Sequence, residues 1–314
     1  MSNLLSIVVP VYNESAVLPE FWARLVPVLD RLQIECEVVF VNDGSTDDSL
    51  EQLVSLSETD PRVSVLDLSR NFGKEIALTA GLDHARGDAA VPIDADLQDP
   101  PEVIEQLVDK WREGYDMVYA TRRSRRGEGW LKRATAASFY RLLGMLSDGA
   151  TVPADTGDFR IIGRRALDAF CQMRERHRFL KGLFASVGFR TTAIHYDRDP
   201  RFAGQTKWNY RRLFLLSIEG ITSHSIAPLR IATFLGLFVA LVAFIYAVWI
   251  IYKTLRFGDP VAGYPSLMTA ILMLGGIQLT TLGIMGEYLG RIFNESKGRP
   301  LYFIQQHWPA RQDE

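Results

Sequence analysis

Two carboxylates separated by one residue are the clearest chemical signal in this chain. Asp94 and Asp96 follow the apolar run 89–93, so both side chains leave the end of an expected strand. Hard divalent cations prefer such oxygen ligands and complete their shell with substrate phosphates. Acidic residues at turns are also commonly just solvated, but Pro100 and Pro101 close this turn rigidly. We therefore expect Asp94 and Asp96 to bind a divalent metal ion.

Other polar side chains follow the other expected strands. Asp43 can accept a hydrogen bond from an N–H on a base edge, and Tyr12 can offer a flat face to a base or ribose. Alternatively, Asp43 serves only as a helix cap or turn-former within Asn-Asp-Gly-Ser. Lys74 follows the third apolar run. Because ligands of parallel α/β sheets bind beyond the carboxyl ends of the strands, we expect one shared crevice.

Two basic segments could bind phosphate. Arg201 and Lys207 flank a Gly-containing turn that could close over a diphosphate, although exposed cations are usually only solvated. A denser cluster consists of Arg122, Arg123, Arg125, Arg126, Lys132 and Arg133. This cluster suits anionic headgroups in general, and it could equally bind one specific lipid phosphate.

Alternating strand and helix patterns position these residues. Period-2 and period-3.6 apolar patterns predict strands at 6–11, 37–41, 63–68, 89–93 and 116–120, and helices at 14–32, up to about 57, 74–85 and 101–113. Ser45, Thr46 and Asp47 can cap the second helix. The alternation predicts an α/β fold with a mainly parallel sheet covered by helices on both faces.

Two uncharged stretches near the C-terminus, 231–252 and 264–286, predict a transmembrane hairpin. At about 1.5 Å per residue, each can cross a hydrocarbon core of roughly 30 Å. A pair of buried core helices is the alternative. The loop between the stretches holds only Lys253 and Arg256, whereas the outer flanks carry Arg211, Arg212, Arg230, Arg291, Lys297 and Arg299. This balance places both termini in the cytoplasm.

Segments 130–146 and 208–221 combine aromatic and aliphatic residues with clustered cations, which suits helices in the headgroup layer. Ordinary amphipathic helices packed on a sheet would look similar. The net charge of -2 gives no global basic field, so we expect no nucleic-acid partner. Cys36 and Cys171 fit reduced thiols, and the N-terminus lacks a secretory leader, so we expect synthesis in the cytosol.

Five motifs in order resemble family 2 glycosyltransferases of the polyprenyl-phosphate type. These are VVPVYNE at 8–14, VNDGS at 41–45, NFGK at 71–74, DADLQDPP at 94–101 and RFAGQTK at 201–207. This family includes dolichyl-phosphate mannose synthases and bacterial undecaprenyl-phosphate glucosyltransferases of the GtrB kind. The resemblance covers nearly the whole chain, including both expected spans.

The resemblance implies a GT-A fold, a Mg²⁺ or Mn²⁺ ion, and inverting transfer from a nucleotide sugar to a polyprenyl phosphate. Carried over by position, the residues that hold the nucleoside are Pro10, Tyr12, Glu14 and Asp43, and Lys74 also belongs to the donor site. The metal is surrounded by Asp94, Asp96 and Gln98, and the diphosphate is bound by Arg201 and Lys207. The acceptor phosphate is bound by Arg122, Lys132 and Arg133. Asp158 resembles the acidic residue near the anomeric carbon, with Asp155 as a neighbouring competitor. It could act as a base or only orient a substrate, because a phosphate monoester is already anionic at pH 7.

The expected organisation is a GT-A domain at 1–207, a juxtamembrane helix at 208–229, two spans within 230–290 and a cytoplasmic tail at 291–314. UDP-glucose is the expected donor, with mannose, GlcNAc or a modified pentose as alternatives. We also expect a homo-oligomer. A processive polysaccharide synthase would carry a Gln-x-x-Arg-Trp segment, which the sequence lacks. A noncatalytic scaffold or flippase component would leave the acidic and basic residues unexplained.

Overall fold

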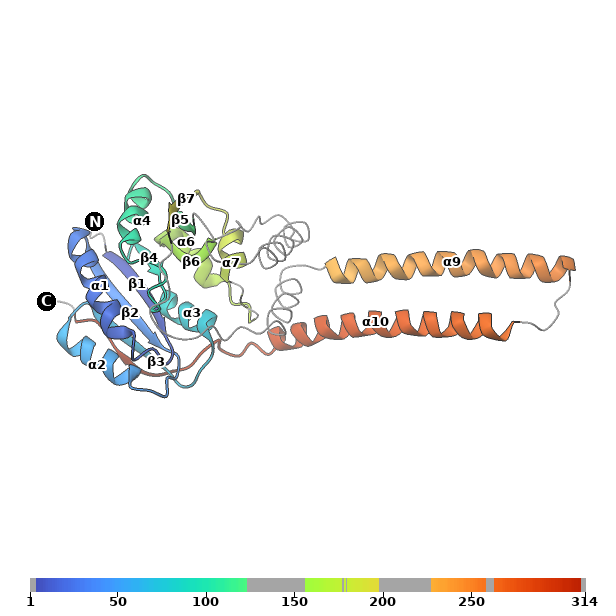
Figure 1. The fold of residues 1–314 in the computed structure, drawn as a ribbon, viewed down its shortest axis with the longest axis horizontal. Helices are drawn as coiled ribbons and strands as arrows, with labels where there is room; N and C mark the ends of the chain where they lie inside the picture. The colour runs from blue at the N-terminus through green and yellow to red at the C-terminus, as the bar shows by residue number, and fades with distance from the viewer. Residues whose placement is uncertain are drawn as a thin grey trace. The chain divides into compact units, whose positions relative to one another are not determined.

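The apolar runs of the first 120 residues form the core of an eight-stranded sheet (Figure 1). This computed structural model describes residues 4–122, 156–176, 178, 180–197, 227–257 and 263–311. The strands are β1 (Leu4–Val11), β2 (Glu35–Asn42), β3 (Val63–Leu68), β4 (Ala89–Pro92), β5 (Met117–Arg122), β6 (Thr156–Gly163), β7 (Thr191–Tyr196) and β8 (Ile304–Trp308). Their order across the sheet is β7-β5-β6-β4-β1-β2-β3-β8.

Strands β1, β2, β3 and β4 are parallel to one another, and β5 is parallel to β7. Among the strands of the described residues, β6 and β8 are the two that run antiparallel to their neighbours. The expected α/β fold with a mainly parallel sheet, as in the GT-A architecture, is therefore confirmed. Neither antiparallel strand was predicted from the sequence pattern.

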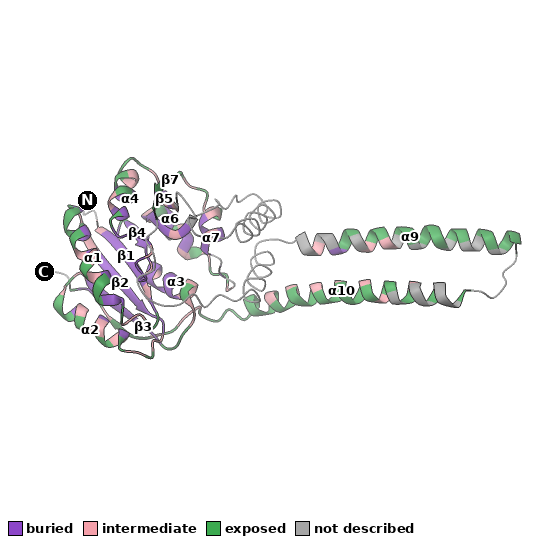
Figure 2. Cartoon of the chain, in the orientation of Figure 1, coloured by how far each residue is buried: buried purple, intermediate pink, exposed green. Residues whose placement is uncertain are grey.

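Helices cover both faces of the sheet, as the alternation predicts. One face carries α1 (Leu18–Arg31), α2 (Ser49–Thr59) and α4 (Val103–Arg112), and the other carries α3 (Lys74–His84), α6 (Arg164–Gln172) and α7 (Leu180–Ser186). Successive β1 residues alternate between the two cores, with Ile7 and Val9 in the first and Val8 in the second. The central strands β1 to β4 are buried between these helices, as Figure 2 shows.

Close packing fixes the position of α3, the helix that begins at Lys74. A Cβ atom added at Gly81 would lie 2.3 Å from Val8 Cγ1 and 2.9 Å from Val41 Cγ2. Only a residue without a side chain lets the helix backbone approach the sheet this closely. This close packing against β1 and β2 fixes the distance between α3 and the sheet, and with it the position of the first turn of α3.

The segment after α10 returns to the sheet. Strand β8 pairs with β3, with Trp308 opposite Val65 and Ile304 opposite Leu68. The tail expected at 291–314 therefore contains an edge strand of the α/β unit. The pattern IQQHW carries too little apolar alternation to predict a strand, and its pairing depends on a partner some 240 residues earlier in the chain.

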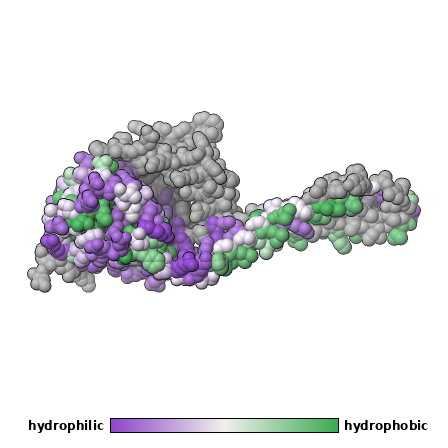
Figure 3. All heavy atoms as spheres, turned by 90° about the horizontal axis from the view of Figure 1, so that it is seen from below, coloured by the Kyte–Doolittle hydropathy of each residue, from purple (hydrophilic) through white to green (hydrophobic). Residues whose placement is uncertain are grey.

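A second compact unit contains α9 (Ala227–Phe257) and α10 (Tyr264–Ser296), which pack against each other. Large apolar side chains are exposed along both helices, including Phe234, Phe238, Trp249, Leu279 and Phe293. Figure 3 shows hydrophobic residues gathered along this unit. Among the residues that the structure describes, no helix is both long enough and apolar enough to cross a membrane. The two expected spans stay a prediction.

Candidate active site

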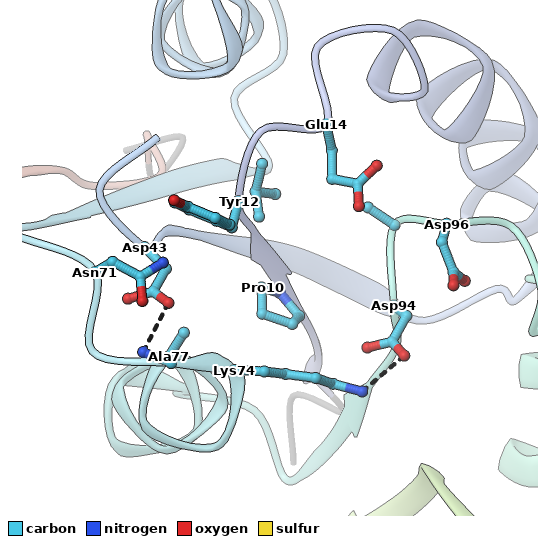
Figure 4. A pocket seen from close by; sticks show the side chains of 12 residues that line it. Pro10, Tyr12, Glu14, Asp43, Asn71, Lys74, Ala77, Asp94 and Asp96 are labelled. Atoms are coloured by element: carbon cyan, nitrogen blue, oxygen red, sulfur yellow. Dashed lines mark hydrogen bonds and ion pairs between the residues drawn. The ribbon is translucent and has the colours of Figure 1, made fainter. Parts of the chain in front are cut away.

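The strand exits meet at one cavity of about 410 Å³ (Figure 4). The expected residues that line it are Pro10, Tyr12, Glu14, Asp43, Lys74, Asp94 and Asp96. They come from the ends of β1, β2 and β4 and from the start of α3. Asn71 and Gly73, in the loop between β3 and α3, also line the cavity. The shared crevice expected from the strand exits is therefore present in the structure.

Hydrogen bonds join the loop after β1 to the loop after β2, and both loops border the cavity. Asn13 has a φ of 54°, and its Oδ1 accepts a hydrogen bond of 2.7 Å from the Thr46 N–H. The Asn13 N–H in turn donates to Ser45 Oγ over 3.0 Å. The expectation that Ser45 and Thr46 cap the helix was wrong, because both bind this neighbouring loop. Asp47 alone serves the helix, by accepting a bond from the Ser49 N–H.

Asp43 organises the loop that precedes α3. Its two carboxylate oxygens accept hydrogen bonds from the backbone N–H groups of Phe72 (2.7 Å) and Gly73 (2.9 Å). Burial raises the pKa of Asp43, and these two donors partly oppose the rise. The turn after β2 is formed instead by Asn42, whose Oδ1 accepts a bond from the Ser45 N–H. The carboxylate is thus held at the cavity wall rather than used in its own turn.

The loops after β2 and β3 touch at Gly44. This glycine has a φ of +65°, and an added Cβ would lie 2.6 Å from both the Arg70 carbonyl carbon and the Asn71 nitrogen. A side chain would strain the backbone and also push the loops apart. The glycine of the Asn-Asp-Gly-Ser motif therefore permits Asp43 to reach the neighbouring loop.

The acidic pair lies in a tight turn after β4. Asp94 and Asp96 both line the cavity, and the residue that follows them, Leu97, has a φ of 58°. Gln98 lies beyond this bend and donates its backbone N–H to Asp96 Oδ1 over 3.1 Å. It is absent from the described residues that line the cavity. Burial raises the pKa of Asp94, against the lowering effect of the Lys74 charge.

A buried contact anchors this turn to the far edge of the sheet. Asp99 is 4% exposed, and its carboxylate accepts a hydrogen bond from the Tyr196 hydroxyl at the end of β7. The Tyr196 ring packs edge-on against Phe159, with ring centroids 6.0 Å apart. Sequence reasoning missed this support, because its two partners are 97 residues apart.

Lys74 links two carboxylates across the cavity. Its Nζ lies 2.7 Å from Asp94 Oδ2 and 2.9 Å from Asp158 Oδ2. Burial lowers the pKa of Lys74, but the two carboxylates outweigh that effect and raise it above its ordinary value. Lys74 is therefore a fixed cation between Asp94 and Asp158, a position that the strand-exit argument alone did not reveal.

Asp158 lies on β6, partly buried among charged side chains. Burial raises its pKa, but the charges of Lys74, Lys181 and Arg160 outweigh burial and keep the pKa below its ordinary value. Asp158 is therefore ionised at neutral pH. Its Oδ1 is buried and has no hydrogen-bond partner among the described residues. Burial, together with the nearby Asp158 charge, raises the pKa of Glu75 to about 7.

Several expected site residues lie outside the described part of the chain. These are Lys132, Arg133, Asp155, Arg201 and Lys207, together with segments 130–146 and 208–221. Arg122 is the last residue of β5, and its side chain is likewise not described. Their proposed phosphate-binding roles stay predictions. Within the described ranges, no group of three or more His, Cys, Asp or Glu residues could by itself hold a metal ion.

Comparison with known proteins gives matches to both units. Residues 6–170 match Glycosyl transferase family 2, and residues 227–292 match the GtrB C-terminal hairpin. The chain is 53% identical over 308 residues to an uncharacterized glycosyltransferase of Synechocystis sp., covering 98% of this chain and 96% of that protein. It is 48% identical over 301 residues to the bactoprenol glucosyl transferase of Shigella phage SfV, covering 96% and 98%.

Among solved structures, the sheet and its helices are similar to glucosyl-3-phosphoglycerate synthase from Mycobacterium tuberculosis in complex with Mn²⁺, uridine diphosphate and phosphoglyceric acid. The sequences are 20% identical, the match covers 70% of this chain and 76% of that chain, and the TM-score is 0.49.

Proposed function

Because the chain belongs to glycosyltransferase family 2, we propose that its cavity binds UDP-glucose and transfers the glucose to bactoprenol (undecaprenyl) phosphate. The family match confirms the resemblance read from the motifs, and the chain is a glycosyltransferase. Support for the acceptor and the sugar comes from the 48% identical bactoprenol glucosyl transferase, which matches over nearly its full length. The observation that carries the proposal is the set of Asp43, Lys74, Asp94 and Asp96 around one cavity.

The donor would lie along the strand exits. Tyr12, whose side chain borders the cavity and is 47% exposed, would stack on the base or ribose. Asp43 retains unused lone pairs, since each of its oxygens accepts one bond from a backbone N–H. These lone pairs would accept an N–H of the base. Lys74 at the start of α3 would face the diphosphate.

Asp94 and Asp96 fit a divalent Mg²⁺ or Mn²⁺ ion. They supply hard carboxylate oxygens at the cavity wall, and the Lys74 ammonium, 2.7 Å from Asp94, shows that this wall already stabilises a cation. Two carboxylates suffice for such an ion when substrate phosphates complete its shell. When bound, the ion would neutralise the charge that develops on the leaving diphosphate. We propose that Gln98 serves the site through the backbone of the turn.

The proposed reaction forms a bond between the acceptor phosphate oxygen and C1 of glucose, while the bond from C1 to the donor diphosphate breaks. UDP leaves with the bonding electron pair, and the configuration at C1 inverts. The acceptor phosphate already carries negative charge at neutral pH, so the step requires no proton removal. Asp158 would therefore use its free Oδ1 to orient the sugar or acceptor.

The acceptor is a lipid, so the cavity must work beside a membrane. The match to the GtrB C-terminal hairpin and the exposed apolar side chains of α9 and α10 support membrane association of this unit. Strand β7 precedes α9 in the chain and strand β8 follows α10, and both strands belong to the same sheet. We propose that both ends of the hairpin lie on the cytoplasmic side of the inner membrane, with two spans between them.

Transfer of another sugar to the same lipid is the principal alternative. The test uses vesicles containing the purified protein, undecaprenyl phosphate and Mg²⁺ or Mn²⁺, with radiolabelled UDP-glucose and a panel of other nucleotide sugars. We expect labelled lipid from UDP-glucose and none from an Asp96→Asn variant that still joins the vesicles. Labelled lipid only from another donor would reassign the sugar. No labelled lipid from any donor would contradict the proposal and favour a scaffold role.

A further inference from the structure

A segment near the C-terminus contacts the loop between β3 and α3, which borders the cavity. After α10, residues 299–308, which we call the return segment, run along the edge of the sheet and end in β8. The ladder with β3 shifts its register between Asp67 and Leu68 and then continues past the end of β3. There the Ser69 N–H donates to the Phe303 carbonyl over 2.9 Å. Pairing therefore extends into the loop that borders the cavity.

Phe72 links Phe303 to the cavity wall. The Phe303 ring lies 6.4 Å from the Phe72 ring at 48°, and the Arg70 guanidinium lies 4.0 Å from the same Phe72 ring centre. The backbone N–H groups of Phe72 and Gly73 hold both oxygens of Asp43. A displacement of Phe72 would therefore move an anchor of Asp43 and the first turn of α3.

A second route runs through the ladder itself. Asp67, which is 4% exposed and opposite Gln306 in β8, accepts a hydrogen bond of 2.7 Å from Asn42 Nδ2. Asn42 forms the turn after β2, directly before Asp43. The return segment thus supports two of the loops that line the cavity.

The return segment is anchored on its other side as well. The Tyr302 hydroxyl donates to Asp83 Oδ2 over 2.9 Å, and Arg174 donates to the same oxygen. Arg176 donates to the carbonyl of Arg299. Farther along, Ser64 Oγ and His307 Nε2 lie 3.1 Å apart. These contacts fix the segment to α3 and to the loop after α6, so it is an integral part of the α/β unit.

From these contacts we infer that the return segment is a positioning element of the donor site. Phe303 orders the loop between β3 and α3, and the backbone of this loop holds the Asp43 carboxylate in place. The inference rests on the proposed donor-binding role of the cavity. Phe303 itself is 56% exposed, so the gain from burying its ring is limited. Its aromatic contact with Phe72 is the specific interaction that orders the loop.

The test measures steady-state KM for UDP-glucose, KM for the lipid acceptor, kcat and Tm in the full-length protein. For Phe303→Ala we expect KM for UDP-glucose to rise about three- to ten-fold, as loss of one aromatic pair predicts, with kcat, acceptor KM and Tm nearly unchanged. Phe303→Tyr keeps the ring and should restore the donor KM. Gln305→Ala, a substitution at an exposed position two residues farther along the return segment, is the matched control.

A double-mutant cycle separates the route through Phe72 from general weakening of the segment. If Phe303 acts through Phe72, adding Phe303→Ala to Phe72→Leu should raise the donor KM little further. An unchanged KM for UDP-glucose in Phe303→Ala would overturn the inference. So would a variant in which both KM values rise to a similar extent while kcat and Tm fall. A wild-type protein that transfers no sugar would instead contradict the proposed function. Binding of UDP with Mn²⁺, measured by calorimetry, would then still compare the variants.

Discussion

At the scale of single residues, the bridge made by Lys74 is the most informative feature of the site. Its ammonium lies within 2.9 Å of both Asp94, in the turn after β4, and Asp158, on β6. Two carboxylates this close to a common point would repel each other without an intervening cation. The charge of the lysine lowers the pKa of both acids against the effect of burial, and its position joins the expected metal side of the cavity to the expected sugar side.

Replacing this cation should impair transfer strongly. We expect Lys74→Met to lower kcat/KM for UDP-glucose by about 10²-fold or more, because two charge-assisted hydrogen bonds are lost. Labelled-lipid formation over a range of donor concentrations measures the effect. Lys110→Met, which removes an exposed surface ion pair with Glu113, is the control and should keep near wild-type activity. Activity near wild type in Lys74→Met would show that the bridge is dispensable.

Glu75, the residue next to Lys74, should make the stability of the folded state depend on pH. Burial raises the pKa of Glu75 from 4.5 to about 7. A carboxyl group with a raised pKa binds its proton more tightly in the folded state, so its stabilising contribution is complete below pH 4.5. That contribution is lost as the pH rises through about 7.

The Glu75→Gln variant should remove this dependence while keeping the hydrogen bond that the Leu180 N–H donates to the side chain. We expect the variant to be more stable than wild type above neutral pH by about 1–3 kcal/mol, and equally stable near pH 4.5. Thermal unfolding in detergent between about pH 5 and pH 8 measures it. Glu58→Gln, an exposed acid on α2, serves as control. Parallel pH profiles in Glu75→Gln and wild type would contradict the expectation.

At the scale of elements, a buried polar network holds β1, β2 and the loop before β4 in place. Glu37 is 3% exposed, and its Oε1 accepts hydrogen bonds from Ser6 Oγ and from the Arg86 N–H, both of 2.6 Å. Arg86 Nε donates to the other carboxylate oxygen over 2.7 Å, and the Gly87 N–H donates to Ser6 Oγ. The network joins elements whose far ends carry the cavity.

Removing the centre of this network should destabilise the sheet. We expect Glu37→Ala to lower the free energy of unfolding by about 3 kcal/mol, because buried donors on Ser6 and Arg86 lose their partner. Glu35→Ala, at the exposed start of the same strand, should change it by less than about 0.5 kcal/mol. Thermal unfolding of the two variants gives the comparison. Equal Tm values for both would indicate that Glu37 adds nothing to stability.

At the scale of the whole molecule, the return of the chain to β3 constrains how a membrane could be crossed. Strand β7 precedes α9 and strand β8 follows α10, and both belong to one sheet, so any membrane crossings between them would have to be even in number. The two expected spans satisfy this requirement. The homo-oligomer stays a prediction.

Cysteine labelling tests this topology. We expect a membrane-impermeant maleimide to label Arg311→Cys only from the cytoplasmic side of intact vesicles and Gly263→Cys only from the other side. Burial raises the pKa of Cys36 to about 11 and that of Cys171 to about 12, so the native thiols should react slowly at neutral pH. The unsubstituted protein gives the background, and permeabilised vesicles give full labelling. Labelling of both new cysteines from one side would refute the crossing.

The sequence by itself determined the strands and helices of the first 120 residues, and the strand exits that carry Tyr12, Asp43, Asp94 and Asp96. These features depend on residues close in the chain, because apolar periodicity and turn residues act locally. The five ordered motifs also indicated the family correctly. Local patterns were therefore sufficient for the α/β class and for the shared crevice.

Only the tertiary structure decided that β6 and β8 join the sheet antiparallel, that Lys74 bridges Asp94 and Asp158, and that the Phe303 ring contacts Phe72. Each of these depends on partners distant in the chain. A short strand such as β8 has a weak pattern of its own and becomes ordered through the edge it pairs with. Long-range pairing of backbone and charge, which leaves no local signature, therefore completed the site.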